Sequence, residues 1–149
     1  MKKLSVMITL SLFLLVSRAS AANEHTIVPA SVSSEFSQEF THVKNVAWAQ
    51  TGNFFKATFR FKGRVCFAYY TANSEFIGIA SNLLSDRLPQ SLKAELKKKF
   101  SGYWITDLFR FSNNDESGFV ITLENPDRVI ILKSTDGQSW GYFQGSAKS

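Results

Sequence analysis

One short string in this 149-residue chain has the spacing of a catalytic motif. Gly137-Gln138-Ser139-Trp140-Gly141 fits the G-x-S-x-G pattern, in which a serine nucleophile stands on a sharp turn between a strand and a helix. Such a serine needs an acid and a histidine farther along the chain. Both histidines, His25 and His42, lie far upstream, and Asp136-Gly137 is a dipeptide typical of hairpin turns. We interpret the string as a turn that leads into a last strand.

The other reactive residue types are scattered along the chain. Neither histidine has a second histidine at metal-ligand spacing, and Cys66 is the only cysteine, inside the strand-like run "GRVCFAYY". Asp115 and Glu116 stand in a polar loop, and the chain has no glycine-rich phosphate loop, C-x-x-C or H-E-x-x-H. The sequence therefore predicts a packed thiol and no catalytic residue, metal site or cofactor. A small hydrolase with an unrecognised serine or carboxylate site stays open as an alternative.

Residues 1–21 have the pattern of a secretory signal. Lys2 and Lys3 precede an apolar run over residues 4–16, and Ala19-Ser20-Ala21 has the small-x-small form of a signal-peptidase site. The run is too short to span a bilayer comfortably. No cysteine adjoins the cleavage site, so a lipid anchor is not expected. The pattern predicts cleavage near Ala21 and a periplasmic or secreted protein without a membrane anchor.

The charge balance changes when this segment is removed. Three of the 17 basic residues lie within it, which leaves 14 basic residues against 12 acidic ones. A nucleic-acid-binding protein normally concentrates more positive charge. The remaining residues, 22–149, have the length of a single domain, whereas two independent domains of half that size would each bury too little surface. The composition thus favours one domain that does not bind nucleic acid.

Two segments of this domain have helical spacing of apolar residues, and each has a proline near its start. The apolar positions are Val32, Phe36 and Phe40 in the first segment and Leu92, Leu96 and Phe100 in the second. At a constant offset of 60 the segments also share residue identities, at Pro29/Pro89, Ser31/Ser91, Glu35/Glu95 and Phe40/Phe100. This agreement indicates an internal repeat.

Four β-rich runs with turn residues between them follow each helical segment. They are "VAWAQ", "FFKATFRFK", "RVCFAYY" and "FIGIAS" in the first half, and "YWITDLFRF", "GFVITLE", "RVIILKS" and "SWGYF" in the second. The repeats, about 28–81 and 88–143, both read as α-β-β-β-β. Joined edge to edge, they would form an α+β, two-layer domain with an antiparallel sheet and both helices packed on one face.

Alternation along the strands predicts which side chains face the helices. The expected inward set is Trp48, Phe55, Ala57, Phe59, Val65, Phe67 and Tyr69, with Leu108, Phe119, Ile121, Leu123, Val129 and Ile131 in the second half. The expected outward set of the second half is Phe109, Phe111, Val120, Thr122, Ile130, Leu132 and Phe143. In the first half, aromatic and basic residues interleave on the outward face. The candidate binding residues are Phe54, Lys56, Arg60, Lys62, Arg64 and Tyr70.

The spacing of apolar, glycine and proline residues resembles that of a family of small exported bacterial proteins, the PepSY-like or β-lactamase-inhibitor-like (BLIP-like) family. The matching positions are Phe36, Phe40, Val46, Trp48, Gly52, Phe55, Ala57, Phe59, Gly63, Ala68-Tyr69, Phe76-Ile77 and Leu88-Pro89. Ser74-Glu75 departs from the pattern, because glycine is common before the charged residue there. The resemblance implies a tandem repeat with helices on an antiparallel sheet, a periplasmic binding or inhibitory role, and no catalytic motif.

These observations predict a non-enzymatic periplasmic or secreted module that recognises a protein or peptide through the exposed sheet face, since aromatic residues and arginine are favoured at interface centres. Two alternatives stay open besides the hydrolase. The outward apolar residues could pack against loops, the N-terminal segment or a second copy, and the chain could be a self-associating envelope protein. The sequence does not define the oligomeric state or the identity of a partner.

Overall fold

The structure of the chain is a computed structural model that describes residues 26–148. The predicted signal segment and His25 therefore lie outside the described residues. Within residues 26–148 no helix is both long enough and apolar enough to cross a bilayer. The chain divides into two compact units: the first runs to Ala80 and includes Asn113–Asp115, and the second comprises Ser81–Ser112 and the residues from Glu116 onward.

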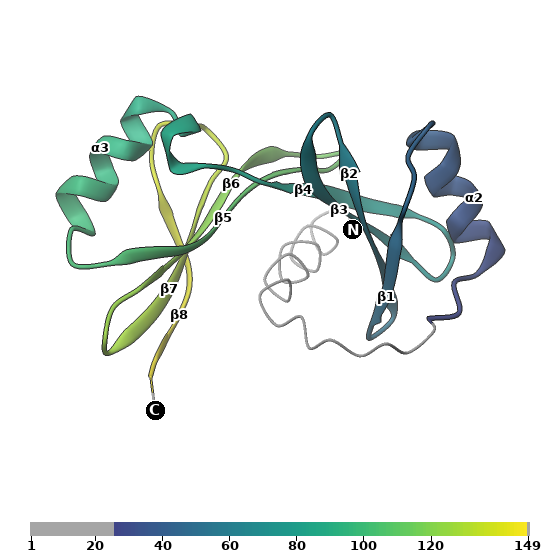
Figure 1. The fold of residues 1–149 in the computed structure, drawn as a ribbon. Coiled ribbons are helices and arrows are strands. Elements are labelled where there is room, and N and C mark those ends of the chain that lie inside the picture. The colour runs from purple at the N-terminus through teal and green to yellow at the C-terminus, as the bar shows by residue number, and fades with distance from the viewer. Residues whose placement is uncertain (1–25, 149) are drawn as a thin grey trace. The chain divides into compact units, whose positions relative to one another are not determined.

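Each unit consists of a ten-residue helix followed by four strands, so the described chain is α+β with eight strands (Figure 1). The first unit has the order α2 (Ala30–Glu39), β1 (Ala47–Thr51), β2 (Phe54–Phe61), β3 (Arg64–Thr71) and β4 (Phe76–Asn82). The second has the order α3 (Gln90–Lys99), β5 (Trp104–Ser112), β6 (Ser117–Glu124), β7 (Arg128–Ser134) and β8 (Gly141–Ala147). A short 3₁₀ helix, η2 (Ser85–Arg87), precedes α3.

Both helices begin and end where the sequence indicates. Pro29 and Pro89 are the N-cap residues of α2 and α3, where a missing amide proton costs no helical hydrogen bond. Phe40 and Phe100 are the C-cap residues, and their amides donate to the carbonyls of Phe36 and Leu96. Within each unit the strands neighbour one another in chain order. The pairs β1–β2, β2–β3, β5–β6, β6–β7 and β7–β8 are antiparallel.

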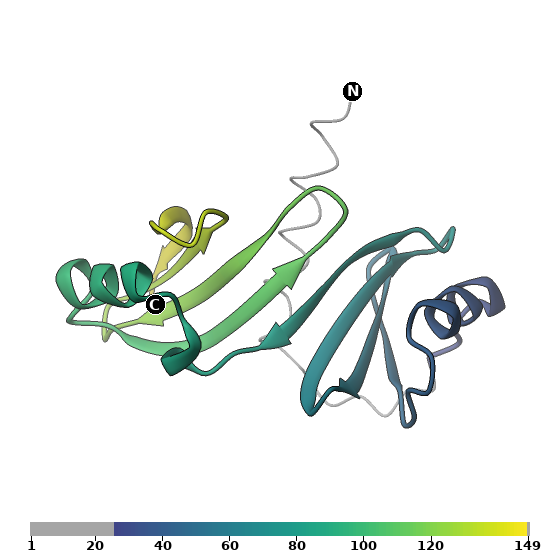
Figure 2. The same ribbon diagram turned by 90° about the horizontal axis from the view of Figure 1, so that it is seen from above.

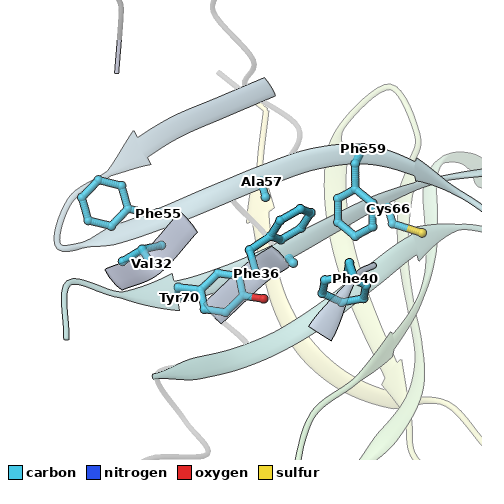
Figure 3. Close-up of a cluster of buried hydrophobic side chains, with 9 residues drawn as sticks. Val32, Phe36, Phe40, Phe55, Ala57, Phe59, Cys66 and Tyr70 are labelled. Carbon is cyan, nitrogen blue, oxygen red and sulfur yellow. The ribbon is translucent and has the colours of Figure 1, made fainter. Parts of the chain in front are cut away.

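An aromatic cluster joins α2 to the strands of the first unit. The Phe36 ring lies 4.9 Å from the Phe59 ring and 5.4 Å from the Trp48 ring, in edge-on contacts that aromatic quadrupoles favour. The Phe40 ring lies 4.8 Å from the same Phe59 ring. Figure 3 shows Phe36 and Phe40 of α2 clustered with Phe59 and Ala57 of β2. Because Ala57 has a small side chain, the rings of α2 can approach the sheet closely.

The second unit has an aliphatic core, which is closed by a loop. Figure 2 shows α3 beside the strands of its unit. Leu92 of α3 packs with Ile121, Leu123 and Leu132 of these strands. In the loop before β8, Trp140 is buried, and its indole Nε1–H donates to the Leu92 carbonyl at 3.1 Å. The backbone amide of Trp140 donates to Glu95 Oε2 at 2.8 Å, so this loop holds α3 through two hydrogen bonds.

The expected register is wrong by one residue in two strands. Cys66, Ala68 and Tyr70 of β3 face α2, in place of Val65, Phe67 and Tyr69. The two-residue turn Lys62-Gly63 decides this, since both residues have positive φ (50° and 78°) and the turn pairs Phe61 directly with Arg64. Paired residues share a face, so Cys66 lies on the helix side with its partner Phe59.

The second strand with a wrong expected register is β7. Ile130 and Leu132 belong to the core beneath α3, in place of Val129 and Ile131. Their partners across the ladder are Leu123 and Ile121, which the sequence correctly placed on the helix side. The residues of β7 are apolar from Val129 to Leu132, so alternation carried no information there.

Removing the central ring of the first core is expected to be costly. Phe36→Ala should lower the free energy of unfolding by about 3–5 kcal/mol, because it leaves a cavity among four aromatic rings. Chemical denaturation followed by circular dichroism measures the change. Ser37→Ala, at an exposed position of the same helix, is the control and should change stability by less than about 0.5 kcal/mol. A loss below about 1 kcal/mol for Phe36→Ala would contradict this packing.

The carboxylate that holds Trp140 should make stability depend on pH. Hydrogen bonds from Lys99 Nζ (2.6 Å) and from the Trp140 amide lower the pKa of Glu95. A depressed folded-state pKa contributes stability above the ordinary value of 4.5, and this is lost as the pH falls through the folded value. Glu95→Gln should therefore be less stable at pH 7 by about 1 kcal/mol, and the gap should narrow below pH 4.5.

Thermal unfolding of Glu95→Gln between pH 3 and pH 8 measures this dependence. Glu35→Gln is a matched control, because Glu35 is likewise the sixth residue of its helix but is exposed on α2. A gap that stays constant across this pH range would show that the Glu95 carboxylate is not the stabilising group.

Candidate functional site

The catalytic-looking string forms a hydrogen-bonded loop. Asp136 accepts hydrogen bonds from the amides of Gln138 (2.8 Å) and Ser139 (3.0 Å), and these bonds lower its pKa to about 2. The Ser139 hydroxyl donates to the other carboxylate oxygen at 3.1 Å. Gly137 takes the left-handed conformation, with φ at 69°, that the turn requires.

This loop does not have the geometry of a nucleophile elbow. A strand, β8, follows it instead of a helix, and the next side chain, Trp140, points into the core. Asp136 is a poor general base, because a carboxylate with a pKa of about 2 binds a proton weakly at neutral pH. Ser139 is thus part of a structural turn, as the sequence indicated.

Cys66 is packed in the core of the first unit. Its side chain lies on the α2 side of β3, and burial raises the pKa of the thiol, which keeps it protonated. Among the residues that the structure describes, no group of three histidine, cysteine, aspartate or glutamate side chains is placed to hold a metal ion. His42 is exposed beyond the end of α2.

The structure brings aromatic, basic and small polar residues together on the face of the first unit opposite α2, which we name the basic face. Its members on β2 and β3 are Phe54, Lys56, Thr58, Arg60, Val65, Phe67, Tyr69 and Thr71, assigned by the cross-strand register. Lys56 pairs with Tyr69, and its Nζ lies 5.8 Å from the centre of the Phe67 ring. Burial lowers the pKa of Lys56 and raises that of Tyr69.

Three of the six candidate binding residues, Phe54, Lys56 and Arg60, lie on this face, and three do not. Tyr70 has 0% exposure and faces α2, where its hydroxyl donates to Glu39 Oε2 at 3.3 Å. Arg64 pairs with Phe61 on the helix side, and Lys62 forms the turn with its Nζ 5.2 Å from the Phe61 ring centre. The expectation that Tyr70 and Arg64 share a face with Lys56 is therefore wrong.

Alternation alone missed three residues of the basic face, Val65, Phe67 and Tyr69. The dipeptide Lys62-Gly63 carries the signal that would have found them, because a lysine-glycine turn of two residues fixes which side chains pair across a hairpin. The run from Val65 to Tyr70 is apolar on both faces, and only the turn distinguishes them.

The face of the second unit opposite α3 has a different composition. Phe109, Phe111, Val120 and Thr122 lie there as expected, with Phe111 and Val120 buried. Lys133 forms an ion pair with Glu116, and the Lys133 Nζ lies 5.1 Å from the centre of the Phe111 ring. An open pocket of about 290 Å³ adjoins this pair, lined by Glu116, Lys133, Thr135, Gly141, Tyr142 and Phe143. Phe143 is the extra residue of a bulge in β8.

These units define an α+β antiparallel fold that solved bacterial proteins share. A BLIP-like protein from Bacteroides fragilis matches with a TM-score of 0.68 and 17% identity, over 83% of this chain and 88% of that one. A DUF2874 family protein from Bacteroides ovatus matches with a TM-score of 0.71 and 17% identity, over 82% and 89%. A Bacteroides eggerthii protein with an ascribed periplasmic location matches with a TM-score of 0.70 and 15% identity, over 82% and 90%.

No protein family matches the chain by sequence, and no curated protein does. At 15–17% identity, the solved structures show that the fold is shared. The prediction of a BLIP-like fold is thus confirmed.

The two sides of the first sheet should respond differently to truncation. Tyr70→Ala should lower the free energy of unfolding by about 3–5 kcal/mol, because it empties a core position. Tyr70→Phe, which removes only the hydroxyl that contacts Glu39, should cost about 1 kcal/mol. Arg60→Ala on the basic face should stay within about 0.5 kcal/mol of the unmodified protein. Urea denaturation of the three variants tests the register, and equal losses at Tyr70 and Arg60 would contradict it.

Proposed function

We propose that this chain is a non-enzymatic, exported binding module that recognises a protein or peptide through the basic face. The fold it shares with a BLIP-like protein and with a protein ascribed to the periplasm supports this proposal, as does the signal-like pattern of residues 1–21. An inhibitor-like action on a partner enzyme is one form that such binding would take.

The composition of the basic face is the observation that carries the proposal. Its charged residues are Lys56 and Arg60, both on β2, and none of the eight residues that define the face is acidic. Burial lowers the pKa of Lys56, so its charged form is poorly solvated in the free protein. An acidic group of a partner would compensate for this desolvation, and Phe54 and Phe67 would supply apolar contact beside it.

The domain organisation belongs to the same proposal. We infer that the two units are tandem repeats of one α-β-β-β-β element. Their helices have equal length at an offset of 60 residues, with proline N-caps and phenylalanine C-caps in both. The apolar positions that recur between the units, Val32/Leu92, Phe36/Leu96 and Phe40/Phe100, pack between helix and strands, so the repeat supplies the scaffold and leaves the opposite faces free to differ.

A partner-capture experiment tests the basic face. The protein, immobilised through its C-terminus, should retain a partner from periplasmic extract of a Bacteroides species, identified by mass spectrometry and then titrated as a purified protein. Lys56→Ala with Arg60→Ala should weaken its binding at least about tenfold, as loss of two central charged contacts does. The melting temperature should change by less than about 2 °C.

The matched control is Lys97→Ala with Lys98→Ala, which removes the same charge from exposed positions on α3. If both double variants bind the partner equally well, the basic face is not the recognition surface. Light scattering on the unmodified protein distinguishes self-association, because a second copy as the occupant would give a concentration-dependent dimer. Inhibition of a purified β-lactamase by the unmodified protein would support an inhibitor-like action.

A further inference from the structure

A β-bulge in β5 brings an aromatic and an acidic side chain to the same face of the second unit. Ile105 pairs with Leu123 and Asp107 pairs with Thr122, which leaves Thr106 as the extra residue. Side chains alternate along a regular strand, so Trp104 and Asp107, three residues apart, would otherwise point to opposite faces. The bulge places both opposite α3, and Glu124, the cross-strand partner of Trp104, shares that face.

An ammonium group already occupies this position. Lys148, which follows β8, has its Nζ 5.1 Å from the centre of the Trp104 ring and 2.9 Å from Glu124 Oε2. Its backbone amide donates to the Asp127 carbonyl at 2.8 Å, which holds the residue beside the turn between β6 and β7. An indole ring is the aromatic group that attracts a cation most strongly, and the carboxylate completes the contact.

Lys148 does not use all of the negative charge and aromatic surface at this site. Asp107 is half-buried, and both its burial and the negative charge of Glu124 raise its pKa. Two carboxylates thus lie on this face, and the Lys148 ammonium group pairs with one of them, that of Glu124. The Trp104 side chain remains 48% exposed, and that of Lys148 is 32% exposed. Exposed cation–π contacts and ion pairs are individually weak, so Lys148 can be displaced.

We propose that Trp104, Asp107 and Glu124 form a binding site for the ammonium or guanidinium group of a basic side chain of a protein partner, with Lys148 as an intramolecular competitor. The indole ring favours an organic cation, whereas a divalent metal ion prefers a shell of oxygen ligands. The site selects the charge opposite to that selected by the basic face and is independent of the function proposed for that face.

Removing the competitor should strengthen binding of a cationic probe. Fluorescein-labelled tetralysine, titrated against the purified protein and followed by fluorescence anisotropy, should bind Lys148→Ala with a dissociation constant roughly threefold to tenfold lower than that of the unmodified protein. Lys98→Ala removes the same charge from α3 and is the matched control. It should bind tetralysine as the unmodified protein does if the gain arises at this site and not from net charge.

Removing the ring should abolish that gain. Trp104→Ala in the Lys148→Ala background should return the affinity to that of the unmodified protein or below, and labelled tetraglutamate should not bind better to Lys148→Ala. Because Trp104 is half-exposed, these variants should keep their melting temperatures. The proposal is overturned if Lys148→Ala binds tetralysine no more tightly than Lys98→Ala, or if loss of the Trp104 ring leaves the gain unchanged.

Discussion

Each unit depends on one contact, the apolar stripe of a ten-residue helix packed on one face of four strands. A helix of this length is marginal alone in water, so its stability comes from burying that stripe. The first unit achieves this with aromatic rings that meet edge to edge, and the second with aliphatic side chains and the buried Trp140. Because one face of the four strands in each unit packs against its helix, the binding that we propose involves the opposite face.

The packing of each helix on one face of its strands explains why the residues that look reactive in the sequence have structural roles. Cys66 and Tyr70 lie under α2, where burial keeps the thiol and the phenol protonated. Asp136 and Ser139 bind each other in the turn that leads into β8, and Glu95 holds α3 to the same loop. Lys56 and Trp104, which carry the two binding proposals, lie on the faces opposite the helices.

The helix ends, the strand order and the helix-facing residues of β2 and β6 could be predicted from the sequence, because they depend on local signals. Proline fixes the start of each helix, and apolar residues every four positions fix its buried side. The predicted faces of β3 and β7 were wrong because both strands are apolar on both sides. Aligning Val65 with Val129 repeated the same error in the second unit. The cation site around Trp104 was missed because it requires a bulge, which alternation cannot reveal.

Both units have apolar residues on the helix side and differ in the chemistry of their outer faces. At the offset of 64 residues that aligns β2 with β6, Phe55, Ala57 and Phe59 correspond to Phe119, Ile121 and Leu123, all apolar on the helix side. On the opposite side Lys56 corresponds to Val120, and Arg60 corresponds to Glu124. A core position tolerates only apolar exchange without a large loss of stability, whereas an outer position can reverse its charge at little cost. Two units with the same order of helix and strands can therefore carry outer faces of different charge.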